Sequence, residues 1–196
     1  ILRPMNGGGV QGIPTWVYPQ AKADGAVQKI LEIAPTGTAT GNGTHSIKLA
    51  GRYAMDSQTY DIAIESGDTA SIICGKIEDA INNVLGSPVI AVNFAYEVDL
   101  TSKWAGLTAN DLQVSIDTND DDLGITYAVN SRQSGSGTPS ISAALTSFGN
   151  NWNTIVINSY GTVSSIMSAL ESFNGIPDPN TPTGRYVGTM MKPFIA

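Results

Sequence analysis

The chain has 196 residues, 41% of them hydrophobic, and a formal net charge of −7, a composition typical of folded globular protein rather than of a disordered chain. Its ten Lys and Arg residues are scattered singly through an acidic sequence of pI near 4.4, which argues against a nucleic-acid partner. The single cysteine excludes a disulfide framework within this chain, and no apolar run is long enough to insert into a membrane.

The first segment is glycine-rich and precedes a predicted strand at Thr15–Pro19. Gly7, Gly9 and Gly12 have the bare spacing of a dinucleotide-binding loop. Such a loop needs a strand before the glycines and a helix after them to hold the pyrophosphate, whereas these glycines lead into a strand. We therefore expect no nucleotide site and no cofactor.

A strand is predicted at Lys29–Ile33, followed by a turn-rich connection from Pro35 to Gly43. Thr44–Ala50 then alternates polar and apolar residues, as a half-buried strand does. A second strand alternates in the same way around Tyr60, Ile62 and Ile64.

An amphipathic helix is predicted next, with Asp68 or Thr69 as its N-cap. Its apolar face recurs every four residues, at Ile73, Ile77, Ile81 and Leu85. Cys74 lies on the same face, so we expect a buried hydrophobic side chain rather than a reactive thiol.

Four further strands follow in the pattern of a mostly antiparallel sheet, at Val89–Val92, Tyr96–Leu100, Leu112–Ile116 and Ile125–Val129. The Gly- and Ser-rich linker Ser134–Pro139 then ends the regular structure.

Beyond the linker, the apolar spacing predicts a short helix, the compact strand Thr154–Ile157 and a second helix. The first helix is marked by Ile141, Ala144, Leu145 and Phe148, and the second by Ile166, Met167, Leu170 and Phe173. The strand needs a partner, which Thr15–Pro19 could supply. We therefore predict an α+β fold with a β-rich insertion domain at 29–139, covered by one helix, and a discontinuous α/β domain from 1–28 and 140–196. Two sequential domains stay open as an alternative, because long-range pairing cannot be read from periodicity.

Asp117–Asp122 carries the oxygen ligands that calcium prefers, but its sixth and twelfth positions are Asp122 and Ala128 instead of glycine and glutamate. The same residues make a solvated turn between two strands. We favour the turn and leave weak cation binding open.

No catalytic constellation is visible in the sequence. His45 is the only histidine, and we expect it to be a partly buried, hydrogen-bonded or interface residue. Asn42-Gly43-Thr44 is formally a glycosylation acceptor, but a turn explains it. Trp16, Trp104 and Trp152 are expected to pack in the core or at a domain interface, with a sugar-stacking platform as the minor alternative. The expected site inventory is empty: no catalytic, cofactor-binding or metal-binding residue.

The stretch from Gly43 to Leu85 contains two strands, the Gly67-Asp68-Thr69 corner and one helix. This stretch resembles a module of the tail sheath proteins of contractile-tailed bacteriophages. Leu100–Lys103, then Gly106 and Asn110-Asp111-Leu112, resembles that family's strand, glycine turn and Gly-Asn-Asp segment. Ala109 stands where the family pattern has a second glycine, which makes the turn conformation there a question for the structure.

The resemblance implies a structural, self-assembling protein of a phage, prophage or related particle. Its expected partners are other copies of itself and a tail tube protein, its expected place is the virion tail, and it would be made in the host cytoplasm. We interpret the chain as a monomeric piece of a longer protein without its terminal assembly arms, since it begins at Ile1 without a methionine. The alternatives are a carbohydrate- or surface-binding β domain of a phage or secreted protein and, less favoured, a hydrolase of unrecognised type.

Overall fold

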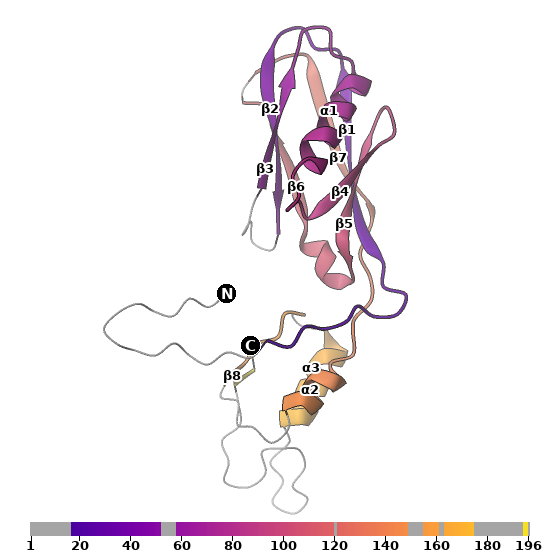
Figure 1. Cartoon of the computed structure of the whole chain (residues 1–196), viewed down its shortest axis with the longest axis vertical. Coiled ribbons are helices and arrows are strands. Elements are labelled where there is room, and N and C mark those ends of the chain that lie inside the picture. Colours follow the sequence, from indigo (N-terminus) through magenta and orange to yellow (C-terminus); the bar gives the residue numbers. More distant parts are fainter. Residues whose placement is uncertain are drawn as a thin grey trace, which may run out of the picture. The chain divides into compact units, whose positions relative to one another are not determined.

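The computed structural model describes residues 17–51, 58–119, 121–148, 155–160, 163–174 and 194–195 (Figure 1). The chain divides into two compact units, one of residues 22–139 and one that joins residues up to 21 with those from 140 onward. The fold is α+β, as the sequence predicts. The strands expected in one mostly antiparallel sheet are divided between two antiparallel sheets. Independent folding of 29–139 as an insertion stays a prediction.

The first sheet of the larger unit has four antiparallel strands in the order β4-β5-β1-β7. These strands are β1 (Gln28–Gly37), β4 (Val89–Asn93), β5 (Val98–Ala105) and β7 (Ile125–Gln133). Strand β1 lies in the middle and buries Leu31 and Ile33. The sheet therefore joins segments about a hundred residues apart in the sequence.

The prediction that β1 ends before a turn at Pro35 is wrong. Its ladder with β5 ends at Ile33, which pairs with Val98, while its ladder with β7 continues to Gly37. A proline is tolerated where a strand has no partner on the side toward which its missing N–H would point. Pro35 therefore stays in the strand and is fully buried.

The second sheet has the order β3-β2-β6 and is also antiparallel. It consists of β2 (Gly43–Ala50), β3 (Gln58–Ile64) and β6 (Gln113–Asp117). The predicted alternation of β2 and β3 is confirmed, because His45, Ile47 and Leu49 face the core together with Tyr60, Ile62 and Ile64.

A short 3-10 helix, η2 (Leu107–Asp111), precedes β6. Gly106, before it, has a φ of 114°, which a residue with a Cβ adopts only under strain. Ala109 is fully buried inside η2 and is not among the positive-φ residues, so alanine is compatible with this position.

Helix α1 (Ala70–Asn82) contributes four fully buried side chains to the core shared by the two sheets, those of Ile73, Cys74, Ile77 and Ile81. The prediction that the helix extends to Leu85 is wrong: Leu85 is 96% exposed. The chain leaves the helix at Asn82 through turns in which Val84 N–H donates to Ile81 and Ser87 N–H donates to Val84. These turns lead the chain into β4.

The predicted side-chain N-cap of α1 is also wrong. Thr69 is the N-cap residue, but its side chain makes no capping hydrogen bond. The Asp68 carboxylate instead accepts hydrogen bonds from the Glu65 N–H and the Lys76 ammonium group, at 2.8 and 2.6 Å. Asp68 therefore closes the corner before the helix rather than capping the helix.

The smaller unit contains α2 (Ser142–Phe148), β8 (Ile155–Val156), α3 (Ser164–Asn174) and β9 (Phe194–Ile195). Its buried cluster is Ile141, Val156, Ile166 and Leu170, in agreement with the predicted helix faces. Strand β8 pairs in parallel with β9. The predicted pairing with Thr15–Pro19 is not observed, since residues 17–19 form no strand and Trp16 lies outside the described residues. A short parallel strand from the far end of the chain satisfies β8 instead.

Candidate functional site at the two sides of the paired sheets

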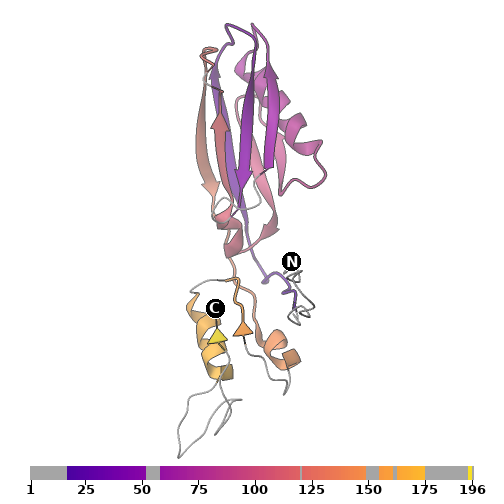
Figure 2. The same cartoon turned by 90° about the vertical axis from the view of Figure 1, so that its left-hand side faces the viewer.

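Helix α1 runs along one side of the larger unit (Figure 1), as the second view also shows (Figure 2). Two of its side chains hydrogen-bond the outer backbone of the neighbouring strands. Lys76 Nζ donates to the Ala63 carbonyl of β3 at 2.9 Å. The Asn82 amide donates to the Ala91 carbonyl of β4 at 2.9 Å and accepts from the Ala91 N–H at 3.0 Å. The helix thus occupies backbone groups that an edge strand would otherwise leave unpaired.

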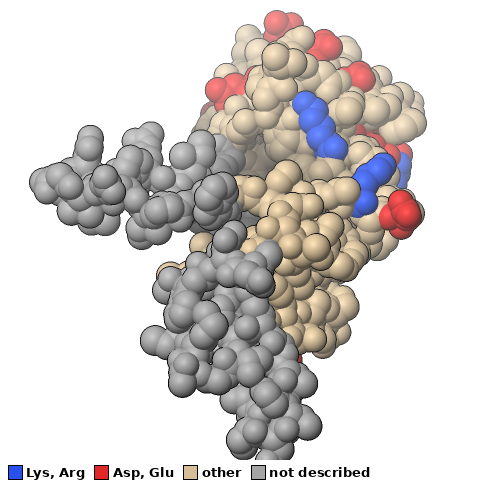
Figure 3. Space-filling model, turned by 60° about the horizontal axis from the view of Figure 1, so that its bottom comes forward, with Lys and Arg blue, Asp and Glu red and all other residues tan. Residues whose placement is uncertain are grey.

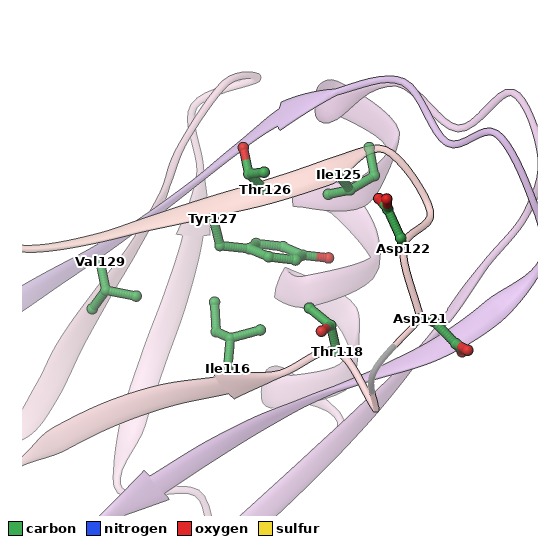
Figure 4. A pocket seen from close by; sticks show the side chains of 8 residues that line it. All are labelled: Ile116, Thr118, Asp121, Asp122, Ile125, Thr126, Tyr127 and Val129. Atoms are coloured by element: carbon green, nitrogen blue, oxygen red, sulfur yellow. The ribbon is translucent and has the colours of Figure 1, made fainter.

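The opposite side, between β6 and β7, holds a cavity of about 530 Å³ (Figure 4). Strand β7 lines it with Ile125, Thr126, Tyr127 and Val129. The rest of the lining comes from β6 and the β6–β7 loop, with Ile116, Thr118, Asp121 and Asp122. In Figure 4 the Tyr127 ring lies between the two strands, and Ile116 and Val129 point into the space between them. Apart from Thr126 and the Tyr127 hydroxyl, the cavity is therefore apolar along its strands, and it is acidic at its loop.

A partly buried hydrogen bond joins the sheets beside this cavity. His45 Nδ1 of β2 lies 2.6 Å from the Tyr127 hydroxyl, and the two rings meet edge to face with centroids 5.5 Å apart. His45 is completely buried, and its Nε2 has no hydrogen-bond partner among the described residues. The histidine that the sequence left between a partly buried and an interface role is a core residue.

Burial sets the protonation states of this pair. It lowers the pKa of His45 below its ordinary value of 6.5, and the negative charge of Asp121 offsets this only in part. Burial also raises the pKa of the Tyr127 hydroxyl far above its usual range, with a smaller contribution from Cys74. The pair is therefore neutral near pH 7, which suits packing better than acid–base chemistry.

The Asp117–Asp122 loop is held as a turn by its own polar groups. Asp117 forms an ion pair with Lys48 at 2.7 Å and accepts the Asn119 N–H at 2.9 Å. The Lys48 hydrogen bond is the main reason that the pKa of Asp117 lies below its usual range. Asn119 has a φ of 55°, and its side-chain amide donates a hydrogen bond to the Thr44 carbonyl. Among the described residues, which omit Asp120, no group of three or more His, Cys, Asp or Glu is placed to hold a metal.

Cys74 is a free, fully buried cysteine in the core, where burial raises the pKa of its thiol to about 11. A neutral thiol is a poor nucleophile, so its surroundings are those of a packing residue. Asp68 behaves in the opposite way: burial alone would raise its pKa, but Lys76 and the Glu65 N–H hold it below its ordinary value.

Sequence reasoning missed an ion cluster on the first sheet. Arg132 of β7 contacts Glu32 of β1, Glu97 and Asp99, at 2.8, 2.5 and 2.8 Å. The hydrogen bond that the guanidinium donates to Glu97, together with the one that it donates to Asp99, raises the pKa of Arg132, which stays protonated. The register that pairs Glu32 with both Asp99 and Asn130 brings these groups together. Only this strand register could have predicted the ion cluster, and the register cannot be read from the sequence.

Of the other residues that the sequence singled out, Trp104 and Asn42 lie in the described part of the chain. Trp104 lies on β5 and is 38% exposed, whereas Trp16, Trp152, Gly7, Gly9 and Gly12 lie outside the described residues. The Asn42 side chain accepts the Ser66 N–H at 2.8 Å, which gives it a structural role in the turn.

The charge distribution does not concentrate basic residues on the face drawn in Figure 3, where the visible Lys and Arg side chains do not merge into a patch. None of the helices in the described ranges is long and apolar enough to span a bilayer.

Comparison with known proteins finds a curated sequence relative and matches among solved structures. The Mu-like prophage FluMu tail sheath protein of Haemophilus influenzae is 28% identical over 154 residues, 77% of this chain. This similarity confirms the resemblance inferred from the sequence motifs. The chain spans 30% of that relative's length. No family model matches the chain.

Two of the matching solved structures are of the flagellar cap protein FliD from Escherichia coli. Its D2–D3 domains share 22% identity, with a TM-score of 0.33 over 56% of this chain and 63% of that one. The D1-D2-D3 structure shares 20% identity, with a TM-score of 0.35 over 60% of this chain and 40% of that one. At these TM-scores neither carries an argument about fold or function.

Proposed function

We propose that this chain, which is similar to a prophage tail sheath protein, is part of a subunit of a contractile tail sheath in a phage or phage-like particle. The observation that carries the proposal is the 28% identity over 77% of the chain. The role is structural rather than enzymatic, and its place is the tail of the particle, after synthesis in the host cytoplasm.

In this role, copies of the subunit stack around an inner tail tube and form a helical array. Head-to-tail contacts that do not close into a ring generate such open growth. The array then changes from an extended to a shortened packing and drives the tube through a cell envelope. A bistable packing change of this kind needs no catalytic residue.

The larger unit offers a candidate surface for contacts between neighbouring subunits. Ile90 and Val92 of edge strand β4 are 49% and 42% exposed, and Phe94, just after the strand, is 53% exposed. Exposed apolar side chains gathered on one strand and its turn are typical of association surfaces. In the proposed sheath, these residues would contact another copy only in the assembled lattice.

The proposal is tested by comparing this 196-residue chain with the complete gene product that carries it. Size-exclusion chromatography with light scattering should give a monomer of 20.5 kDa for the chain. The complete gene product should sediment as a polymer. A Val92→Glu substitution in the complete gene product should weaken polymerisation through the proposed surface, whereas Asp79→Asn, at an exposed position on α1, should leave it intact.

A complete gene product that stays monomeric at high protein concentration and in molar salt would contradict the sheath role. Polymerisation that is equally strong with Val92→Glu would contradict the contact surface and leave the sheath role standing.

A further inference from the structure

The two sides of the larger unit differ in how the outer backbone groups of their edge strands are hydrogen-bonded. On the α1 side, side chains from the helix hydrogen-bond the outer backbone of β3 and β4. On the other side, within the part of the chain that the structure describes, β7 pairs only with β1, and β6 pairs only with β2. Among the described residues, no hydrogen bond joins β6 to β7. The β7 edge therefore presents unpaired backbone groups beside a cavity.

The register shows which backbone groups of β7 are free. Pro35 pairs with Tyr127 although proline has no N–H. Antiparallel strands alternate between residue pairs that exchange hydrogen bonds and pairs that do not, so Pro35 and Tyr127 form a pair without them. The N–H and C=O groups of Tyr127, and of Val129 two residues along, therefore point away from β1 toward the free edge.

The side chains along this edge are also incompletely covered. Val129 faces the space between the sheets, yet it is 41% exposed. Ile116 lines the same cavity from β6, and Asp121 and Asp122 lie at its loop end. A ligand that fills this space would meet apolar side chains along the strands and two carboxylates at one end.

We propose that the free edge of β7 accepts an extended segment of a partner polypeptide as an added strand, with an apolar side chain against Val129 and Ile116 and a Lys or Arg beside Asp121 and Asp122. Backbone hydrogen bonds along an edge strand and pockets for alternate side chains are the two sources of affinity in strand addition. The net charge of −7 favours a basic segment over a second copy of this acidic chain. The inference does not depend on the sheath role, because it needs only the edge and the cavity.

The probe is a fluorescein-labelled peptide of about seven residues, the length of an ordinary strand, that alternates valine and lysine. A peptide with glutamate in place of lysine is the charge control. Fluorescence polarisation with the full 196-residue chain should show saturable binding of the lysine peptide and weaker binding at high salt. The glutamate peptide should not bind.

The decisive variant is Val129→Pro, which removes the outward N–H without breaking the ladder to β1. It should weaken binding at least about tenfold. Val129→Thr keeps the N–H and the branched shape and should retain most of the binding. Asp121→Asn combined with Asp122→Asn should weaken binding about threefold to tenfold and reduce its salt dependence.

Hydrogen exchange on the wild-type chain keeps the test independent of how well Val129→Pro folds. Bound peptide should slow exchange of the Val129 amide, while the Ala91 amide, already bonded to Asn82, should not change. No saturable binding, equal binding by a folded Val129→Pro chain, or equal binding of the glutamate peptide would overturn the proposal. It would also be overturned by self-association through β7, or by glycan binding in the cavity, without binding of the lysine peptide.

Discussion

The side-chain amide of Asn82 makes both main-chain hydrogen bonds of Ala91, as a neighbouring strand would. Its Nδ2 donates to the Ala91 carbonyl at 2.9 Å, and its Oδ1 accepts the Ala91 N–H at 3.0 Å. Asn82 is the last residue of α1, and Ala91 is the middle residue of β4. One residue therefore ties the end of the helix to the edge of the sheet.

Asn82→Ala should lower the free energy of unfolding by about 1–2 kcal/mol, because two hydrogen bonds are lost and the backbone groups of Ala91 lose their partner. Asn83→Ala is the matched control, since this exposed neighbour should change stability by less than about 0.5 kcal/mol. Urea unfolding of both variants checks the prediction. Equal stability of the two variants would show that the Asn82 bonds contribute nothing net.

The protein should become less stable as the pH falls from about 7.5 to about 5.5. The folded-state pKa of His45 lies below its ordinary 6.5. Between these two pKa values the unfolded chain therefore binds a proton that the folded chain does not bind. The stabilisation is complete above 6.5 and is lost as the pH falls toward the lower folded-state pKa, by at most about 1.4 kcal/mol per pH unit.

His45 is the only histidine, so the effect can be assigned to it directly. Urea unfolding of wild type and His45→Gln at both pH values separates its contribution, and the variant should lose the slope. The pKa values of Asp68 and Asp117 are lowered below 3.8, so these carboxylates stay ionised throughout the window. A slope unchanged in His45→Gln would refute the assignment.

Gly37→Ala should be much more harmful than Gly67→Ala. Both glycines have positive φ values, 102° and 93°, so both substitutions carry backbone strain of about 1–2 kcal/mol. At Gly37 the added Cβ would also lie 2.2 Å from the Gly124 carbonyl oxygen, whereas at Gly67 nothing lies within 4 Å. Thermal unfolding should show a clearly larger loss of stability for Gly37→Ala than for Gly67→Ala. Similar losses of stability would argue against the close approach of β1 to Gly124, the residue before β7.

Residues 22–139 should fold alone and be more stable than 29–139. Val27 accepts hydrogen bonds from the Gly106 and Ser136 N–H groups and donates to the Ser136 carbonyl at 2.9 Å, and the shorter piece lacks these bonds. Dispersed amide resonances and a cooperative melt are expected for both pieces, with the higher melting temperature for 22–139. A collapsed spectrum for both would contradict the insertion-domain proposal.

The sequence predicts the local elements of this fold better than their ends. Alternation in β2 and β3 is readable because each strand has one buried face, so a period of two is imposed on the residues themselves. The end of α1 and the course of β1 through Pro35 depend on which neighbours continue alongside. The positions of Leu85 and Pro35 in the apolar pattern do not show which elements lie beside them.

The site residues depend even more on long-range register. His45 and Tyr127 are 82 positions apart, and Arg132 meets Asp99 across 33. Pairing of this kind follows from the arrangement of the sheets, which periodicity does not specify. The sequence could therefore place His45 on a buried face but could not name Tyr127 as its partner.

Negative-stain electron microscopy of the complete gene product that carries this chain tests the central proposal most directly. The sheath role predicts long hollow tubes from the complete gene product and dispersed particles from the 196-residue chain under the same conditions. A complete gene product that stays dispersed at high concentration and in molar salt would contradict it.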